Sequence, residues 1–105
     1  MKQAKANGSG NGTAAYKFKL FVTGTTPVSG KAISNIRKFC ELHLPGKFDL
    51  EVIDVAQSPR LAKENQLVAV PTLIKELPLP VRRFIGDMSS TEKLCAGLSL
   101  KPIVP

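Results

Sequence analysis

The sequence has few residues that could carry redox or metal chemistry. Its 105 residues include two cysteines and one histidine, and tryptophan is absent. Cys40 and Cys95 stand far apart in stretches whose patterning predicts helices, and we expect both to be buried free thiols rather than a disulfide. A structural zinc site needs clustered Cys and His ligands. We therefore expect neither a metal nor any other cofactor.

Long hydrophobic runs are also missing. No apolar stretch approaches the roughly 20 residues of a membrane-spanning helix. The chain begins with a polar, glycine-rich segment where a secretory signal would be apolar. Residues 1–15 carry too few apolar side chains to offset chain entropy, so we expect a flexible tail. Residues 16–105 have room for a single domain. We expect a cytoplasmic protein without a membrane partner.

Acidic residues are outnumbered by basic ones, 8 to 15, which gives a formal net charge of +7. Apart from the pair Arg82-Arg83, the basic residues are scattered, as is typical of a solvated surface or a face that meets an acidic protein. Nucleic acid is a weaker alternative, because phosphate contacts need only well-placed cations. The single tyrosine, and the absence of interleaved aromatic and basic residues, argue against base stacking.

The first half of the chain predicts a strand, a helix and a second strand. Residues 16–22 begin with period-two alternation and end wholly apolar, as a strand entering a core does. After a break, apolar residues recur every three or four positions, which predicts a helix of about 14 residues that ends at Pro45-Gly46. Residues 48–53 alternate again. This order is typical of a right-handed βαβ unit with parallel strands.

The second half contains signals for two helix starts. Ser58 is expected to be the N-cap of a helix that has Pro59 at its first position and ends near Gln66. A capping box from Ser89 to Glu92 predicts the start of a final helix.

Between these helices the sequence predicts two more strands. Residues 67–70 lead into a third strand at residues 71–74, residues 77–80 form a rigid proline turn, and residues 81–85 return as a fourth strand. The predicted class is α/β, with the order βαβαββα and helices on both faces of a four-stranded mixed sheet. This topology resembles that of thioredoxins.

Two local features bear on the thioredoxin resemblance. Residues 70–73, Val-Pro-Thr-Leu, resemble the segment that carries the thioredoxin cis-proline, although an ordinary trans bond before Pro71 is the alternative. Thr26 and Ser29 stand where thioredoxins place their two reactive cysteines. Hydroxyl groups cannot exchange disulfides, and the only histidine, His43, falls about 20 Å away along the helix. We expect both residues to cap the helix, and the protein not to be an enzyme.

Several segments resemble proteins of the KaiB family, and the match runs from Tyr16 to about Leu98. The most specific part is the proline-rich stretch that carries Arg82-Arg83 and leads into Ile-Gly-Asp, which ordinary thioredoxins lack. The segments are residues 21–27, 55–59, 70–73, 77–83 and 85–89.

The resemblance implies a regulatory function and two possible folds. KaiB proteins bind the ATPase KaiC, sequester KaiA and push the clock kinase toward dephosphorylation. The family is metamorphic: a ground state, βαββααβ, assembles as a tetramer, and a thioredoxin-like state binds KaiC. Pro71, Pro78 and Pro80 interrupt the short strands of the second half, so register there is weakly fixed. These prolines and Gly97 are the candidate fold-switch positions, although Ser99 stands where an aspartate is usual.

The family's partner-binding positions carry over unevenly. Arg82 and Arg83 match the family's double arginine, and Lys31 replaces an arginine that helps to capture KaiA. Glu51 and Gln66 occupy positions where clock proteins usually have the lysines that help to bind KaiC. These departures favour a divergent KaiB that works with its own KaiC-like ATPase, in a clock or in stress signalling. A homo-oligomeric ground state, tetramer or dimer, is expected.

Two other functions stay open. One is a thioredoxin-like sensory or adaptor domain of the kind found in the clock histidine kinase SasA. The other is a basic nucleic-acid-binding adaptor, for which the net charge is the only argument.

Overall fold

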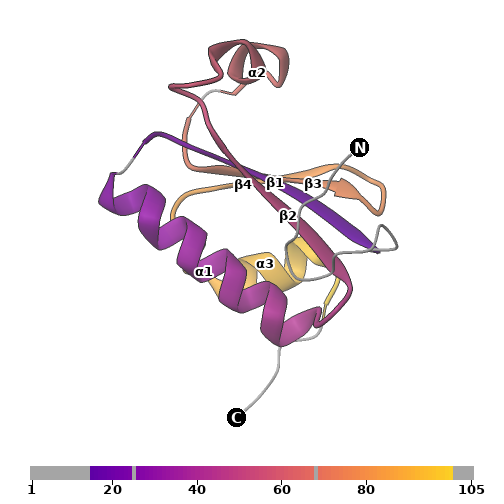
Figure 1. Ribbon diagram of the computed structural model, residues 1–105. Coiled ribbons are helices and arrows are strands. Elements are labelled where there is room, and N and C mark those ends of the chain that lie inside the picture. Colours follow the sequence, from indigo (N-terminus) through magenta and orange to yellow (C-terminus); the bar gives the residue numbers. More distant parts are fainter. Residues whose placement is uncertain (1–14, 25, 68, 101–105) are drawn as a thin grey trace.

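The structure is a computed structural model that describes residues 15–24, 26–67 and 69–100. Its elements are β1 (Tyr16–Val22), α1 (Pro27–His43), β2 (Phe48–Asp54), α2 (Pro59–Glu64), β3 (Thr72–Leu77), β4 (Arg82–Ile85) and α3 (Thr91–Leu98). The strands form one sheet in the order β2-β1-β3-β4, with β1 parallel to β2 and the other two pairs antiparallel. The predicted thioredoxin-like α/β fold is confirmed, and the βαββααβ order is not the one adopted (Figure 1).

Two apolar clusters hold the helices against opposite faces of the sheet. Neighbouring side chains on a strand point to opposite faces, so Leu20 joins the larger cluster with α1 and α3, and Phe21 joins a smaller one beside α2. Figure 1 shows α1 and α3 on one side of the sheet and α2 on the other. We call these sides the α1/α3 face and the α2 face. The prediction that helices cover both faces is confirmed.

The start of α1 uses both hydroxyl groups that the sequence singled out. Thr26 is the N-cap, because its Oγ1 accepts a hydrogen bond from the Ser29 amide at 3.2 Å, and Pro27 occupies the first helical position. The prediction for Ser29 was wrong: it does not cap the helix. Its side chain is buried, and its Oγ accepts from the Thr23 amide at 3.1 Å. The apolar face is as expected, with the buried residues Ala32, Ile36, Phe39 and Cys40.

The starts of the two later helices differ from the predicted ones. Ser58 holds the N-cap position of α2 but its side chain makes no capping hydrogen bond, and the helix ends at Glu64 rather than near Gln66. The prediction that a capping box at Ser89 begins the last helix was wrong by one residue. The Ser89 amide donates to Asp87 Oδ1 at 3.0 Å, which turns the chain, and Ser90 then caps α3.

The second-half strands are offset from the predicted ones. β3 runs from Thr72 to Leu77, so it extends beyond the predicted end at residue 74, and β4 begins at Arg82 rather than at residue 81. The Val70–Pro71 bond is cis, the geometry that the thioredoxin resemblance implies, and the bonds before Pro78 and Pro80 are cis as well.

The predicted flexible tail is residues 1–15, and all but the last of these lie outside the described residues. Within the described part of the chain, no helix is long and apolar enough to cross a membrane.

Candidate partner-binding surface

The turn that would carry the reactive cysteines of a thioredoxin serves here to begin a helix. Thr26 Oγ1 and Ser29 Oγ are both engaged with backbone groups. His43 lies at the other end of α1, where its ring stacks on Phe39 at a centroid distance of 4.2 Å. A hydroxyl nucleophile needs a neighbouring base, and His43 is not placed to serve either hydroxyl.

The two thiols are buried, as expected. Cys40 is fully buried, and this burial raises the pKa of its thiol to about 12, with a smaller contribution from the negative charge of Glu41. Cys95 is also buried and free, and its Sγ lies 3.7 Å from His43 Nε2. Because the thiolate is the reactive form, the Cys40 thiol is inert at neutral pH.

Arg82 and Arg83 point to opposite faces of the sheet. Arg82 shares the α1/α3 face with Phe84, which packs against the larger cluster. Its positive charge adds to burial in lowering the pKa of Lys75, which it opposes across the β3–β4 pair. Arg83 lies on the α2 face. Its guanidinium donates to the carbonyl of Gln66 at 3.5 Å and to that of Asn65.

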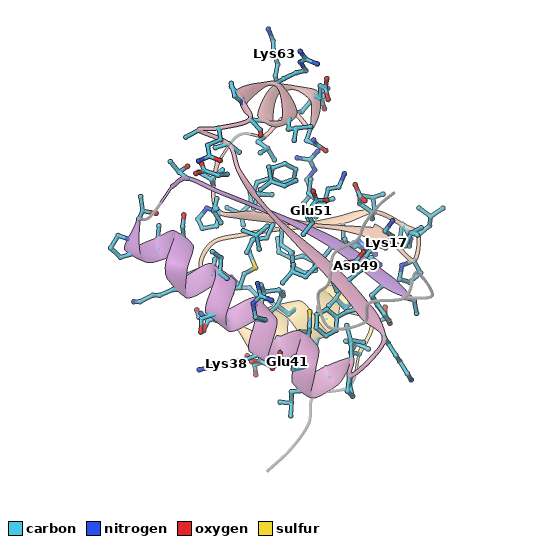
Figure 2. The ribbon with its side chains drawn as sticks, viewed as in Figure 1. Lys17, Lys38, Glu41, Asp49, Glu51 and Lys63 are labelled. Carbon is cyan, nitrogen blue, oxygen red and sulfur yellow. The ribbon has the colours of Figure 1, made fainter. Side chains whose placement is uncertain are left out.

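Three of the five predicted partner-binding residues therefore share the α2 face. Gln66 and Arg83 are in direct contact. Glu51 is exposed on β2, and since Leu50 belongs to the cluster on the opposite face, Glu51 faces the α2 side. Figure 2 shows Glu51 beside Asp49 and Lys17 over the open end of the sheet, with Lys63 at the far tip of α2.

Lys31 is placed elsewhere, on the exposed side of α1. Its charge contributes, after the hydrogen bonds from Ser89, to holding the pKa of Asp87 below its usual range. Asn35, one turn along α1, donates to the Asp87 carbonyl at 2.9 Å. The hydrogen bond from Asn35 to Asp87 links α1 to the loop of residues 86–90, and the sequence did not predict it. Gly86-Asp87 is a turn signal that predicts the loop but not the helix that it contacts.

The charged residues on the open part of the α2 face were also missed as a group. Lys19 Nζ lies 3.2 Å from Glu76 Oε2, the one ion pair among the described residues. These two side chains line a polar cavity of about 260 Å³ together with Lys17, Asp49 and Glu51. Strand alternation could have found this cluster, because all five residues occupy α2-face positions of neighbouring strands.

The candidate fold-switch positions differ in their surroundings. Pro71 is buried, whereas Pro78 and Pro80 are exposed at the β3–β4 turn. Gly97 lies against the Phe84 ring so closely that a Cβ atom there would overlap it. Their role in fold switching stays a prediction.

The fold and the altered turn together define a thioredoxin-like protein in which the redox cysteine pair is replaced by a helix cap. Residues 19–100 match the family model described as the KaiB domain. The chain therefore belongs to the KaiB family.

Relatives and solved structures agree with this assignment. The chain is 48% identical over 85 residues to the circadian clock oscillator protein KaiB of Synechococcus elongatus, covering 81% of this chain and 83% of that one. It is 44% identical to the circadian clock protein KaiB3 of Synechocystis, covering 80% and 82%. The N-terminal domain of Synechococcus elongatus SasA has a similar fold, with a TM-score of 0.68 at 23% identity over 98% of this chain and 94% of that domain. Yeast mitochondrial thioredoxin 3 gives 0.65 at 18% identity, covering 82% and 78%.

Proposed function

We propose that this protein is a non-enzymatic regulator that binds a KaiC-like ATPase in a circadian clock or a related signalling system. The observation that carries the proposal is the 48% identity to circadian clock oscillator proteins over four fifths of the chain. The replacement of the redox cysteines by Thr26 and Ser29 supports a binding role rather than disulfide exchange. By binding, the protein would shift the phosphorylation state of the ATPase and sequester a KaiA-type partner.

The α2 face is the surface we assign to the ATPase. Glu51, Gln66 and Arg83 all lie on it, and these are positions that the family resemblance connects with partner binding. Lys31 lies on α1, away from this face, which suits the separate KaiA-type contact that the resemblance implies. One molecule would then meet two partners on different sides.

The test is co-migration on native gels with the KaiC-like ATPase of the same genome, with and without ATP. We expect a slower-migrating complex whose amount depends on the nucleotide. Absence of a complex under all nucleotide conditions would overturn the proposal. Steeply salt-dependent binding to DNA would instead favour the nucleic-acid adaptor. The likeness to SasA, at 23% identity, shows the fold alone.

A charge reversal at Glu51 tests the surface. Glu51→Lys restores the charge that clock proteins usually carry there, and we expect it to tighten binding to Synechococcus elongatus KaiC by about tenfold, since a misplaced charge at an interface is repulsive. The control is Glu41→Lys, the same change on the outer side of α1 (Figure 2), which should leave affinity within twofold. Equal effects of the two variants, measured by interferometry, would remove the α2 face from the proposal.

We also propose a domain organisation, a cellular location and an oligomeric state for this protein. Residues 16–105 form one domain behind a tail of residues 1–15, the protein is cytoplasmic, and free protein self-associates as a dimer or tetramer. Light scattering coupled to size-exclusion chromatography tests the last point, for which a monomer at all concentrations is the contrary result.

A further inference from the structure

β4 leaves one side of its backbone without a partner strand in the described part of the chain, since it is the last strand of the sheet. The Gly86 amide donates to the Pro71 carbonyl at 3.1 Å, so this pair is a hydrogen-bonded one. Hydrogen-bonded pairs alternate along an antiparallel ladder, and Phe84, opposite Leu73, therefore also bonds inward. It follows that Arg83 and Ile85 direct their N–H and C=O groups outward.

This free edge borders a hollow. A cavity of about 360 Å³ is lined by residues 83–85 of β4, by the loop of residues 86–90, and by Lys93 and Leu94 of α3. An extended chain laid along β4 would have its backbone against Arg83 and Ile85 and would direct side chains into this hollow.

The surroundings of the edge are basic. Arg82 and Arg83 are exposed on β4, and Lys93 is exposed on α3 with no ion pair among the described residues. Asp87 is the acidic group of the cavity lining, and its Oδ1 is already engaged by the Ser89 amide. Arg83 and Lys93 outnumber it in the lining, so a carboxylate entering the hollow would meet a net positive charge.

We propose that the β4 edge and the adjoining hollow bind an acidic peptide in extended conformation, by strand addition. Backbone hydrogen bonds to Arg83 and Ile85 would hold the peptide, and its carboxylates would lie near Lys93 and Arg82 on the α1/α3 side of the sheet. A second copy of this chain fits less well, because antiparallel β4–β4 pairing would bring like charges opposite one another. The proposal does not depend on the ATPase.

The probe is a labelled, blocked octapeptide of alternating Val and Glu, titrated into the full-length protein. We expect fluorescence anisotropy to show binding at least roughly tenfold tighter than for the Val/Lys octapeptide, and weaker with added salt. A Val/Glu peptide N-methylated at every residue should lose most of its affinity, because it cannot donate to the edge. Equal binding of the Glu and Lys peptides, or of the N-methylated one, would overturn the proposal.

Amide hydrogen exchange locates the site. In the free protein the amides of Arg83 and Ile85 should exchange quickly and those of Arg82 and Phe84 slowly; the peptide should protect the first pair. Lys93→Gln should weaken binding about two- to fivefold, whereas Lys63→Gln, the same change on α2, should not. Three results would contradict the assignment. The peptide could protect β2 instead, self-association alone could protect Arg83 and Ile85, or the two lysine variants could have equal effects.

Discussion

Arg82 and Arg83 are neighbours in the chain but have different surroundings. Arg82 lies beside Lys75 on the α1/α3 face, where two like charges oppose one another. Arg83 holds the carbonyls that follow α2. Gln66 has a positive φ of 54°, which is an unfavourable backbone conformation for a residue other than glycine. Arg83 donates to the carbonyl of this residue. Arg83 therefore has a structural role in addition to any role in partner binding.

Single substitutions separate these roles. Arg83→Ala should lower the free energy of unfolding by about 1 kcal/mol, because two charge-assisted hydrogen bonds are lost at an exposed site. Arg82→Ala should stay within about 0.5 kcal/mol. Urea unfolding gives both values, and amide exchange of residues 59–66 should accelerate only in Arg83→Ala. Indistinguishable variants would mean that the hydrogen bonds of Arg83 contribute nothing to α2.

Cys40 makes stability depend on alkaline pH. Its pKa is raised from 9.0 to about 12 in the folded protein, so above pH 9.0 the unfolded chain loses a proton that the folded protein keeps. The unfolded state then binds fewer protons, and the free energy of unfolding falls as pH rises from 9.0 toward 12. Urea unfolding should show this slope to be steeper in the wild-type protein than in Cys40→Ala. Parallel pH profiles would contradict the burial of a protonated thiol.

At the scale of elements, the helix starts show what local pattern can and cannot predict. The Thr26 cap was predictable because an N-cap hydroxyl and a following proline are local signals. Ser29 was not, since its Oγ bonds to Thr23 across a turn. The Ser89 capping box was wrong because Asp87 accepts from the Ser89 amide in an Asx turn, a local pattern that competes with the capping box for the same amide.

The α1 cap gives a prediction at this scale. Thr26→Ala should lower the free energy of unfolding by about 1 kcal/mol, the usual cost of losing an N-cap hydroxyl. Thr26→Ser keeps the acceptor and should recover most of that loss. Thermal and urea unfolding provide the comparison, and an equally destabilised serine variant would show that the methyl group, not the hydroxyl, matters at this position.

The candidate site could be predicted only in part from the sequence, because its residues come together through contacts between distant parts of the chain. The resemblance indicated Arg82 and Arg83 as one motif, and only the strand's alternation separates them onto two faces. The contact between Arg83 and Gln66 joins residues 17 positions apart, and its geometry depends on where α2 ends. Glu51 joined them on the same face only once the strand order was known.

Across the whole molecule the element order was predicted correctly in both halves, and the bounds of the elements were predicted better in the βαβ half than in the second half. β1 and β2 alternate clearly and are joined by a helix with a continuous apolar stripe. The second half has strands of six and four residues separated by prolines, and such segments are compatible with more than one pairing. The structure shows the thioredoxin-like order, with the Thr26 hydroxyl capping α1 after the turn from β1 and with exposed charge on the α2 face.

The proposed function is regulation of a KaiC-like ATPase by direct binding. The most direct measurement is the phosphorylation state of the KaiC-like ATPase of the same genome, followed over time on gels with and without this protein. We expect a shift toward the dephosphorylated form that grows with the amount of protein added. Identical time courses with and without a saturating amount would contradict it.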